Sequence, residues 1–302
     1  MKEQIKIIIE YIRKRVYMNI NWYPGHMAKT KKQIQEDLKL IDVVVEILDA
    51  RIPVSSQNPD ISTMIKNKKR IILLNKTDLS DETENKKWEE YFRKNNIIAI
   101  RTNGNTGTGL KEMLSRAESM MAQELQEQAK KGRIGKSIRI MIVGIPNVGK
   151  SSIINKLTKK TSALVGNRPG VTRQKQWIRL NNKIELLDTP GVLWPKFQTE
   201  ETALNLSYIG TIKDDNLDLV ELSYHLLKYL YENYPEKLKE RYKLQDQELE
   251  NTTILELTET IARKRGALKS GNCIDEEKIA RIILEDFRTG KTGKITLERC
   301  KE

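Results

Sequence analysis

The 302-residue sequence predicts an α/β protein, with a mostly parallel, doubly wound sheet followed by a smaller, all-helical C-terminal domain. Strand-length apolar runs alternate with helix-length segments up to residue 188, and from about residue 200 only helical spacing remains. No apolar run approaches the ~18 residues that cross a bilayer. A 38% apolar and 31% charged composition predicts a soluble globular chain without a membrane partner.

Residues 1–18 form one amphipathic pattern, with Ile5, Ile8 and Ile12 on a single stripe. Charges interrupt this segment, and no small-residue cleavage site follows it, so it is not expected to be a secretory signal. An alternative start at Met18 would make it an upstream extension. No function is assigned to it.

The next predicted domain, residues 19–198, contains the alternating elements. Buried strands are expected at residues 41–49, 70–75, 97–101, 138–143 and 183–188, and helices at 27–39, 58–68, 82–94, 109–130 and 149–159. Parallel strands need crossover helices, so this alternation predicts a parallel sheet. The third domain, residues 199–302, has helical spacing at 215–233, 252–265 and 275–288, punctuated by Pro235 and Gly266.

A phosphate loop is predicted where the strand 138–143 runs into Gly144-Ile-Pro-Asn-Val-Gly-Lys-Ser151 and then a helix. Its glycines let backbone N–H groups turn onto phosphates, and the helix N-terminus adds positive potential. Lys150 should reach the β and γ phosphates, and Ser151 should bind Mg²⁺.

A guanine-reading loop is predicted at Asn75-Lys76-Thr77-Asp78, which closes another buried strand. The Asp78 carboxylate can accept hydrogen bonds from guanine N1–H and the exocyclic amine, which adenine lacks in that arrangement. Asn75 would bond the base edge and tie loops together, and the Lys76 stem would pack on the ring. Thr102 and Asn103, after strand 97–101, would buttress the base.

Two further segments follow the phosphate loop in the order of nucleotide-sensing switches. Thr172, in Pro169-Gly-Val-Thr172, is the predicted second hydroxyl ligand of Mg²⁺, with an ordinary loop threonine as the alternative. Asp188, in Asp188-Thr-Pro-Gly191, would hold Mg²⁺ through water, and the Gly191 N–H would sense the γ phosphate. The predicted nucleotide contacts are Asn75, Lys76, Asp78, Thr102, Asn103, Asn147, Val148, Gly149, Lys150, Ser151, Ser152, Thr172 and Gly191, and the predicted metal ligands are Ser151, Thr172 and Asp188.

Val192 stands where Ras-like enzymes carry the glutamine that orients the attacking water, so slow basal turnover is expected. Asn147 could hold a potassium ion against the phosphates. His26 could orient or deprotonate water near neutral pH, or instead hydrogen-bond a loop or contact RNA. The predicted catalytic set is His26, Lys150, Thr172 and Gly191.

The net charge of +13 is concentrated in the first two thirds of the chain, because residues 205–302 carry 17 basic and 19 acidic side chains. Between Glu127 and Glu185 there are 14 basic residues and no acidic one. Such a field attracts polyphosphate, which makes RNA the expected large partner. A solvated face beside one nucleotide site is the alternative. In the helical domain, the cluster Arg263-Lys-Arg265 is a candidate RNA contact, with a solvated helix end as its alternative.

The guanine-reading loop precedes the phosphate loop, the reverse of the order in an ordinary small GTPase, so the P-loop GTPase domain is predicted to be circularly permuted. With Asn21-Trp-Tyr-Pro-Gly-His-Met-Ala-Lys29, Asp49-Ala-Arg-Ile-Pro53 and Phe287-Arg-Thr-Gly-Lys-Thr-Gly-Lys294, the sequence resembles the permuted bacterial GTPases of the YlqF/RbgA family. Residues 1–18 depart from the family pattern.

The resemblance implies a cytoplasmic GTPase that binds rRNA in an immature large ribosomal subunit and leaves after hydrolysis. It also implies GTP/GDP, Mg²⁺, potassium stimulation at Asn147 and a catalytic part for His26. A monomer is expected, and two cysteines without a disulfide framework fit a reducing cytosol. The alternatives are a GTPase acting on the small subunit or on tRNA, and a GTP-gated RNA-binding module with incidental turnover.

Overall fold

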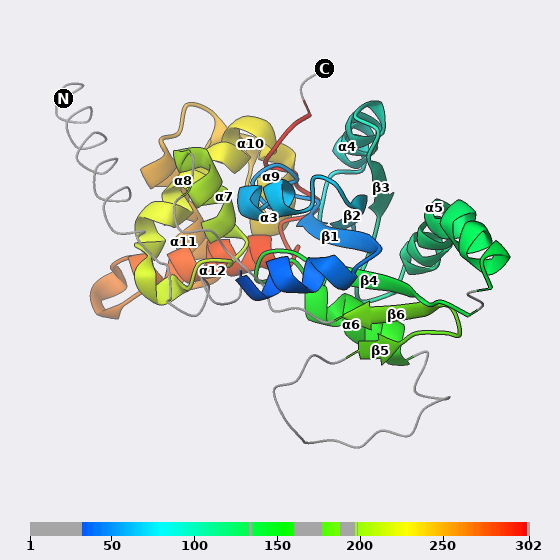
Figure 1. The fold of residues 1–302 in the computed structure, drawn as a ribbon. Coiled ribbons are helices and arrows are strands. Elements are labelled where there is room, and N and C mark those ends of the chain that lie inside the picture. Colours follow the sequence, from blue (N-terminus) through cyan, green and yellow to red (C-terminus); the bar gives the residue numbers. More distant parts are fainter. Residues whose placement is uncertain (1–31, 133–134, 160–176, 188–196, 198, 301–302) are drawn as a thin grey trace. The chain divides into compact units, whose positions relative to one another are not determined.

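The computed structural model describes residues 32–132, 135–159, 177–187, 197 and 199–300 (Figure 1). The described chain divides into two compact units. A sheet unit contains residues 32–187 together with 296–300, and a helical unit contains residues 199–295. The sequence-based division places residues 296–300 in the helical domain, whereas in the structure they pack with the sheet unit.

The sheet has six strands in the order β3-β2-β1-β4-β6-β5, all parallel except β5. Their bounds are Val43–Asp49 (β1), Lys69–Asn75 (β2), Ile98–Arg101 (β3), Ile138–Val143 (β4), Trp177–Arg179 (β5) and Ile184–Leu187 (β6). The predicted doubly wound, mostly parallel sheet is confirmed. The edge strand β5 was not predicted, because two half-exposed residues and one exposed residue give no detectable period.

The helices of the sheet unit connect these strands. Their bounds are residues 32–37, Leu38–Leu40 (η1), Pro59–Met64 (α3), Glu82–Lys94 (α4), Leu110–Lys130 (α5) and Lys150–Lys159 (α6). Asn58 and Asp81 accept hydrogen bonds from the first turns of α3 and α4, which fixes where both helices begin. Helix α3 ends earlier than predicted, and residues 27–31 of the expected first helix lie outside the described residues.

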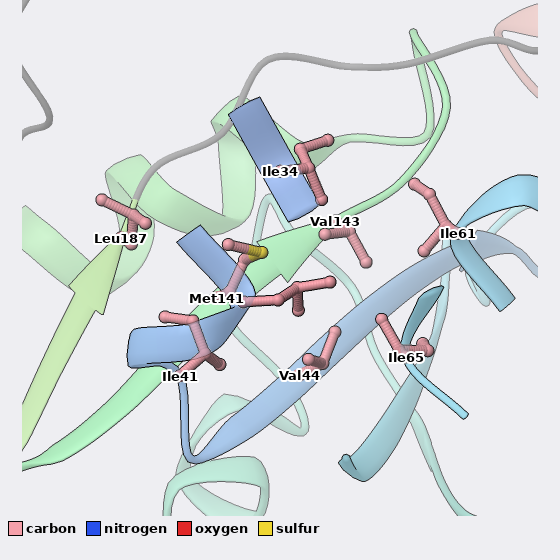
Figure 2. Packing of buried hydrophobic residues seen from close by; sticks show 9 residues of the cluster. Ile34, Ile41, Val44, Ile61, Ile65, Met141, Val143 and Leu187 are labelled. Atoms are coloured by element: carbon pink, nitrogen blue, oxygen red, sulfur yellow. The ribbon is translucent and has the colours of Figure 1, made fainter. Parts of the chain in front are cut away.

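Apolar side chains cover both faces of the sheet. On one face, Figure 2 shows Val44, Met141 and Val143 of the strands against Ile34 and Ile61 of the helices. The strand register places Ile72 and Leu74 on this same face, where they pack against Trp88 and Phe92 of α4. On the opposite face, the alternate β1 residues Val45 and Ile47 are also buried. All seven residues of β1 are buried, which explains why its sequence is apolar except for Glu46 and Asp49.

The direction of winding changes between β1 and β4. From β1 the chain proceeds outward through β2 and β3, whereas β4 is followed on its other side by β6 and β5. In open α/β sheets the crevice for a ligand lies at such a switch point, beyond the carboxyl ends of the strands. The loops that follow β1, β2 and β4 therefore define the place to look for a site.

The helical unit contains no strand among its described residues. Its elements are Glu200–Tyr208 (α7), Asp214–Asn216 (η2), Leu219–Asn233 (α8), Pro235–Tyr242 (α9), Asp246–Leu249 (α10), Ile254–Arg265 (α11), Ser270–Asn272 (η3) and Glu276–Arg288 (α12). Asp286, buried on α12, accepts both Arg241 contacts at 2.6 and 2.8 Å. In the cluster considered for RNA, Lys264 pairs with Glu248 at 2.9 Å and Arg265 with Asp286 at 3.4 Å, while Arg263 is exposed.

Throughout the described part of the chain, the helices are too short or too polar to cross a membrane.

Candidate nucleotide-binding site

The phosphate-loop sequence occupies the turn between the end of β4 at Val143 and the start of α6 at Lys150. Gly149 has φ +96°, and a Cβ there would lie 2.3 Å from Asn75 Nδ2. A Cβ on Gly144 would lie 2.8 Å from the carbonyl oxygen of Ile47. Both glycines are therefore required by backbone shape and close packing. Val148 is fully buried, whereas the side chain of Asn147 is exposed. The backbone of Asn147 has φ 64°, in the left-handed region.

Asn75 joins three loops that come from different parts of the chain. Its Nδ2 donates to the carbonyl of Val148 at 2.7 Å, and its Oδ1 accepts from the Gly104 N–H at 2.9 Å. The side chain is 2% exposed, so these bonds are shielded from water. One buried amide thus holds the predicted guanine-reading loop against the phosphate loop and against the loop that follows β3.

Lys76 makes a second connection between the same loops. It has φ 63°, and its Nζ donates to the carbonyl of Asn147 at 2.7 Å. The same Nζ lies 3.0 Å from Asp49 Oδ2, at the end of β1. The lysine stem therefore runs beside the phosphate loop, and Asp49 fixes its charged end.

Asp49 is fully buried and is held by Arg51 as well as by Lys76. Arg51 Nε and one terminal nitrogen each donate to an Asp49 oxygen at 2.9 Å. Burial opposes ionisation of Asp49, but the two neighbouring cations outweigh it and hold the pKa of this carboxyl well below its usual range. The Asp49–Pro53 motif thus supports the guanine-reading loop, a role that the sequence reading did not assign.

Asp78 is exposed, as a carboxylate that reads a base must be before the nucleotide arrives. Thr77 anchors its loop, because the Thr77 hydroxyl donates to the carbonyl of Thr102 at 3.1 Å. Thr102 is fully buried, and its own hydroxyl donates to Ile100 O at 3.1 Å. The Asn103 Oδ1 accepts from the N–H groups of Asn105 and Thr106, at 2.8 and 3.1 Å. These side chains shape the loop that borders Asp78.

The first turn of α6 carries Lys150, Ser151 and Ser152. Ser151 and Ser152 are exposed, and Lys150 is half-buried. The N–H groups and the dipole of a helix start favour an anion here, and a serine hydroxyl is a suitable ligand for a hard cation such as Mg²⁺. A Cβ on Gly104 would lie 3.3 Å from that of Ser152, which shows how closely the loop after β3 approaches α6.

The remaining predicted site residues, His26, Thr172, Asp188 and Gly191, lie outside the described residues, as does Val192. Strand β6 ends at Leu187, one residue before Asp188, and Leu187 pairs with Met141 of β4. The structure therefore brings together the phosphate loop and the guanine-reading loop, and among the predicted metal ligands it describes Ser151.

Comparison with known proteins decides the family. Residues 139–261 match the family model described as a 50S ribosome-binding GTPase. The chain is 45% identical to ribosome biogenesis GTPase A of Bacillus cereus over 94% of its length and 95% of that protein. The chain belongs to the ribosome biogenesis GTPase A family. It is also 34% identical to the Thermotoga maritima member, over 94% of this chain and 95% of that protein.

Solved structures of the family agree with this fold. The crystal structure of GNP-bound YlqF from T. maritima matches with a TM-score of 0.60 and 30% identity, over 90% of this chain and 98% of that one. The GDP-bound structure of the same protein matches with a TM-score of 0.59, over 89% and 100% of the two chains. The predicted family and the predicted GTPase fold are confirmed.

Proposed function

We propose that this protein binds and hydrolyses GTP during late assembly of the large ribosomal subunit, contacts rRNA there, and is released after hydrolysis. The observation that carries the proposal is the bonding of a guanine-reading loop to a phosphate loop through Asn75 and Lys76. The family model that matches residues 139–261 is described as a 50S ribosome-binding GTPase, which supports the large subunit as the target.

Guanine selection is assigned to Asp78. Its carboxylate would accept from guanine N1–H and the exocyclic amine, and a site built for such bonds rejects bases that lack the donors. The structure supports this role, because Asp78 is exposed at the end of a loop whose other members are tied down. The solved relatives with GNP and GDP bound are consistent with a guanine nucleotide.

The phosphates would lie over the turn between β4 and α6, with Lys150 on the β and γ phosphates. Mg²⁺ would be held by Ser151 together with Thr172 and Asp188, and it would neutralise the charge that develops on the phosphates. A potassium ion beside Asn147 would add positive charge there, which the exposed Asn147 side chain permits. Val192 cannot orient water, so His26 is proposed to orient it when the particle is bound.

The RNA-binding face is assigned to the basic, exposed positions of the sheet unit. Among the described residues they include Lys130, Lys131, Lys159 and Arg179. No acidic residue occurs in the sequence between Glu127 and Glu185, so the local field remains positive. Binding through phosphate contacts predicts affinity that falls steeply as salt rises.

The deciding experiment measures GTP hydrolysis in potassium buffer by the protein alone, with purified large subunits and with purified small subunits. We expect a rise of about 10-fold or more with large subunits only, as for other GTPases that are completed by a partner. The same series in sodium buffer tests the potassium site. Equal, slow turnover in every mixture would contradict the large-subunit assignment.

Val192 favours one alternative function, a GTP-gated RNA-binding module in which turnover is incidental. Under this alternative, the protein would bind RNA more tightly with a non-hydrolysable GTP analogue than with GDP, and no ribosomal particle would increase its rate of GTP hydrolysis. Stimulation by small subunits or by tRNA in the same experiment would instead identify those as targets. The large subunit is preferred because of the matching family model.

A further inference from the structure

The end of the chain returns to the sheet unit as a short segment, residues 296–300, here called the terminal strap (red in Figure 1). The helical unit ends at Ile295, so the strap follows directly after it in the sequence. Thr296 is fully buried, and Leu297 and Glu298 are 6% and 9% exposed. A terminal segment this buried is not a loose tail, and neither the sequence motifs nor the proposed function account for it.

Glu298 anchors the strap on the loop that follows β1. Its carboxylate accepts from the Val54 N–H at 2.6 Å, from the Ser55 N–H at 2.9 Å and from the Ser55 hydroxyl. Hydrogen bonds to a charged, shielded acceptor are among the stronger ones in proteins. One side chain therefore fixes the conformation of residues 54–55, which immediately follow the Asp49–Pro53 motif.

The strap backbone bonds to the motif itself. The Leu297 N–H donates to the carbonyl of Arg51 at 2.9 Å. The Arg51 side chain holds Asp49, and Asp49 holds Lys76 on the phosphate loop. A continuous series of contacts thus leads from the strap through the buried Arg51 and Asp49 to Lys76 and the carbonyl of Asn147.

The strap also supports the far side of the guanine-reading loop. The Thr296 hydroxyl accepts from the N–H of Asp81 at 3.0 Å, three residues after Asp78. Asn75 and Lys76 fix the near side of this loop, as described above. The residues that flank Asp78 are therefore bound on one side to the phosphate loop and on the other to the strap.

We propose that Glu298 is a positioning residue for the guanine nucleotide, through which the terminal strap holds the guanine-reading loop and the phosphate loop in register. This inference rests on the proposed function, since it presumes a guanine nucleotide at the site. The strap connects the end of the helical unit to the loops of the nucleotide site, in addition to the chain connection that follows Asp188–Gly191 in the sequence. The time that GDP remains bound would then depend on the strap.

The test uses full-length proteins with Glu298→Gln or Glu298→Ala. It measures the release rate and the affinity of GDP and of inosine diphosphate (IDP), each carrying a fluorescent N-methylanthraniloyl label. We expect GDP release about 3-fold faster in the first and about 10-fold faster in the second, in proportion to the hydrogen bonds lost. IDP lacks the exocyclic amine, so a displaced Asp78 should weaken GDP more than IDP. A narrowed GDP-to-IDP affinity ratio is a change that general loss of stability would not produce.

Glu84→Gln is the matched control. Glu84 is 7% exposed and accepts from the Cys300 N–H of the same strap at 2.8 Å, but it lies on α4 and its charge pairs with Lys87 of that helix at 3.1 Å. We expect its GDP release to remain within 2-fold of the unaltered protein. Thr296→Val, which keeps the shape of the side chain, should reproduce the Glu298 effect if the Glu298 variants fold poorly.

The outcomes separate the two proposals. Normal GDP release and an unchanged GDP-to-IDP ratio in the Glu298 and Thr296 variants would overturn the positioning role while the nucleotide site stands. An equal effect of Glu84→Gln would also overturn it, because the strap would then act only through stability. Failure of the unaltered protein to bind GDP would refute the proposed function, and the positioning role with it.

Discussion

Asp49→Asn is the sharpest test of how the site is held together. The substitution keeps the size of the side chain but removes the charge that Arg51 and Lys76 share. Arg51 is 1% exposed and would remain buried without its counter-ion, whereas the Lys76 side chain is 22% exposed and can regain water. Breaking a buried ion pair on one side costs about 3–5 kcal/mol. We expect the lower end, about 3 kcal/mol, because Lys76 can be rehydrated.

The assay is urea unfolding followed by tryptophan fluorescence, together with thermal melting. A loss of about 3 kcal/mol corresponds to a fall of roughly 6–12 °C in Tm for a unit of this size. Glu90→Gln is the control, since Glu90 is 51% exposed and pairs with Arg93 at 3.2 Å on the surface. An exposed pair is worth at most about 1 kcal/mol.

The pH dependence gives an independent check. The pKa of Asp49 is depressed in the folded protein, so its contribution is fully present above the ordinary pKa of aspartate and is lost as pH falls below it. The difference between the unaltered protein and Asp49→Asn should therefore be constant from pH 5 to 8 and shrink in stronger acid. If Asp49→Asn is no less stable than Glu90→Gln at pH 7, the support assigned to this motif is refuted.

Three other substitutions test separate parts of the site and fold. Asp78→Asn should shift binding from GTP toward xanthosine triphosphate by at least ~10-fold, measured by competition, and an unchanged preference for GTP would contradict base reading by Asp78. His26→Ala should slow particle-stimulated GTP hydrolysis by ~10-fold or more without changing nucleotide affinity. Normal stimulated hydrolysis would instead favour the alternative that His26 contacts RNA. Burial, with Asp218 and Glu200 nearby, raises the pKa of Glu221 to about 7, so stability should fall as pH rises from about 4.5 to 7. The Glu221→Gln variant should lack this loss of stability, so its Tm should be about 2 °C above that of the unaltered protein at pH 8 and equal to it at pH 4.5. A Tm below that of the unaltered protein at pH 8 would contradict this.

The sequence predicted best where a short-range pattern and a tertiary requirement coincide. Strand β4 was predicted with its observed bounds because an apolar run stops at Gly144, where a Cβ would lie only 2.8 Å from the carbonyl oxygen of Ile47. The guanine-reading loop was found because its residues lie next to one another. The edge strand β5 was missed because sheet edges need no apolar run.

The supports of the site were missed for a different reason. Asp49 lies at the end of an apolar strand, and a nearby basic residue was the only local sign of its buried ion pairs. Glu298 contacts residues more than 240 positions away in the sequence, and Thr-Leu-Glu-Arg-Cys at residues 296–300 has no period to read. Such contacts depend on the topology that brings the chain end back to β1, which a single sequence does not encode locally.

The permuted chain order explains why these two supports belong together. The helical unit is reached from the sheet unit after β6, next to the predicted switch Asp188–Gly191, and it leads into the strap beside the guanine-reading loop. The helical unit is thus flanked in the sequence by the predicted phosphate-sensing switch at one end and by the strap that supports the guanine-reading loop at the other. A partner that alters the strap when it binds the helical unit must change nucleotide affinity by the same factor by which nucleotide changes affinity for that partner. The effect of the partner on GDP affinity and the effect of GDP on partner affinity would then be two measurements of one coupling free energy, and a strap variant should reduce both effects together.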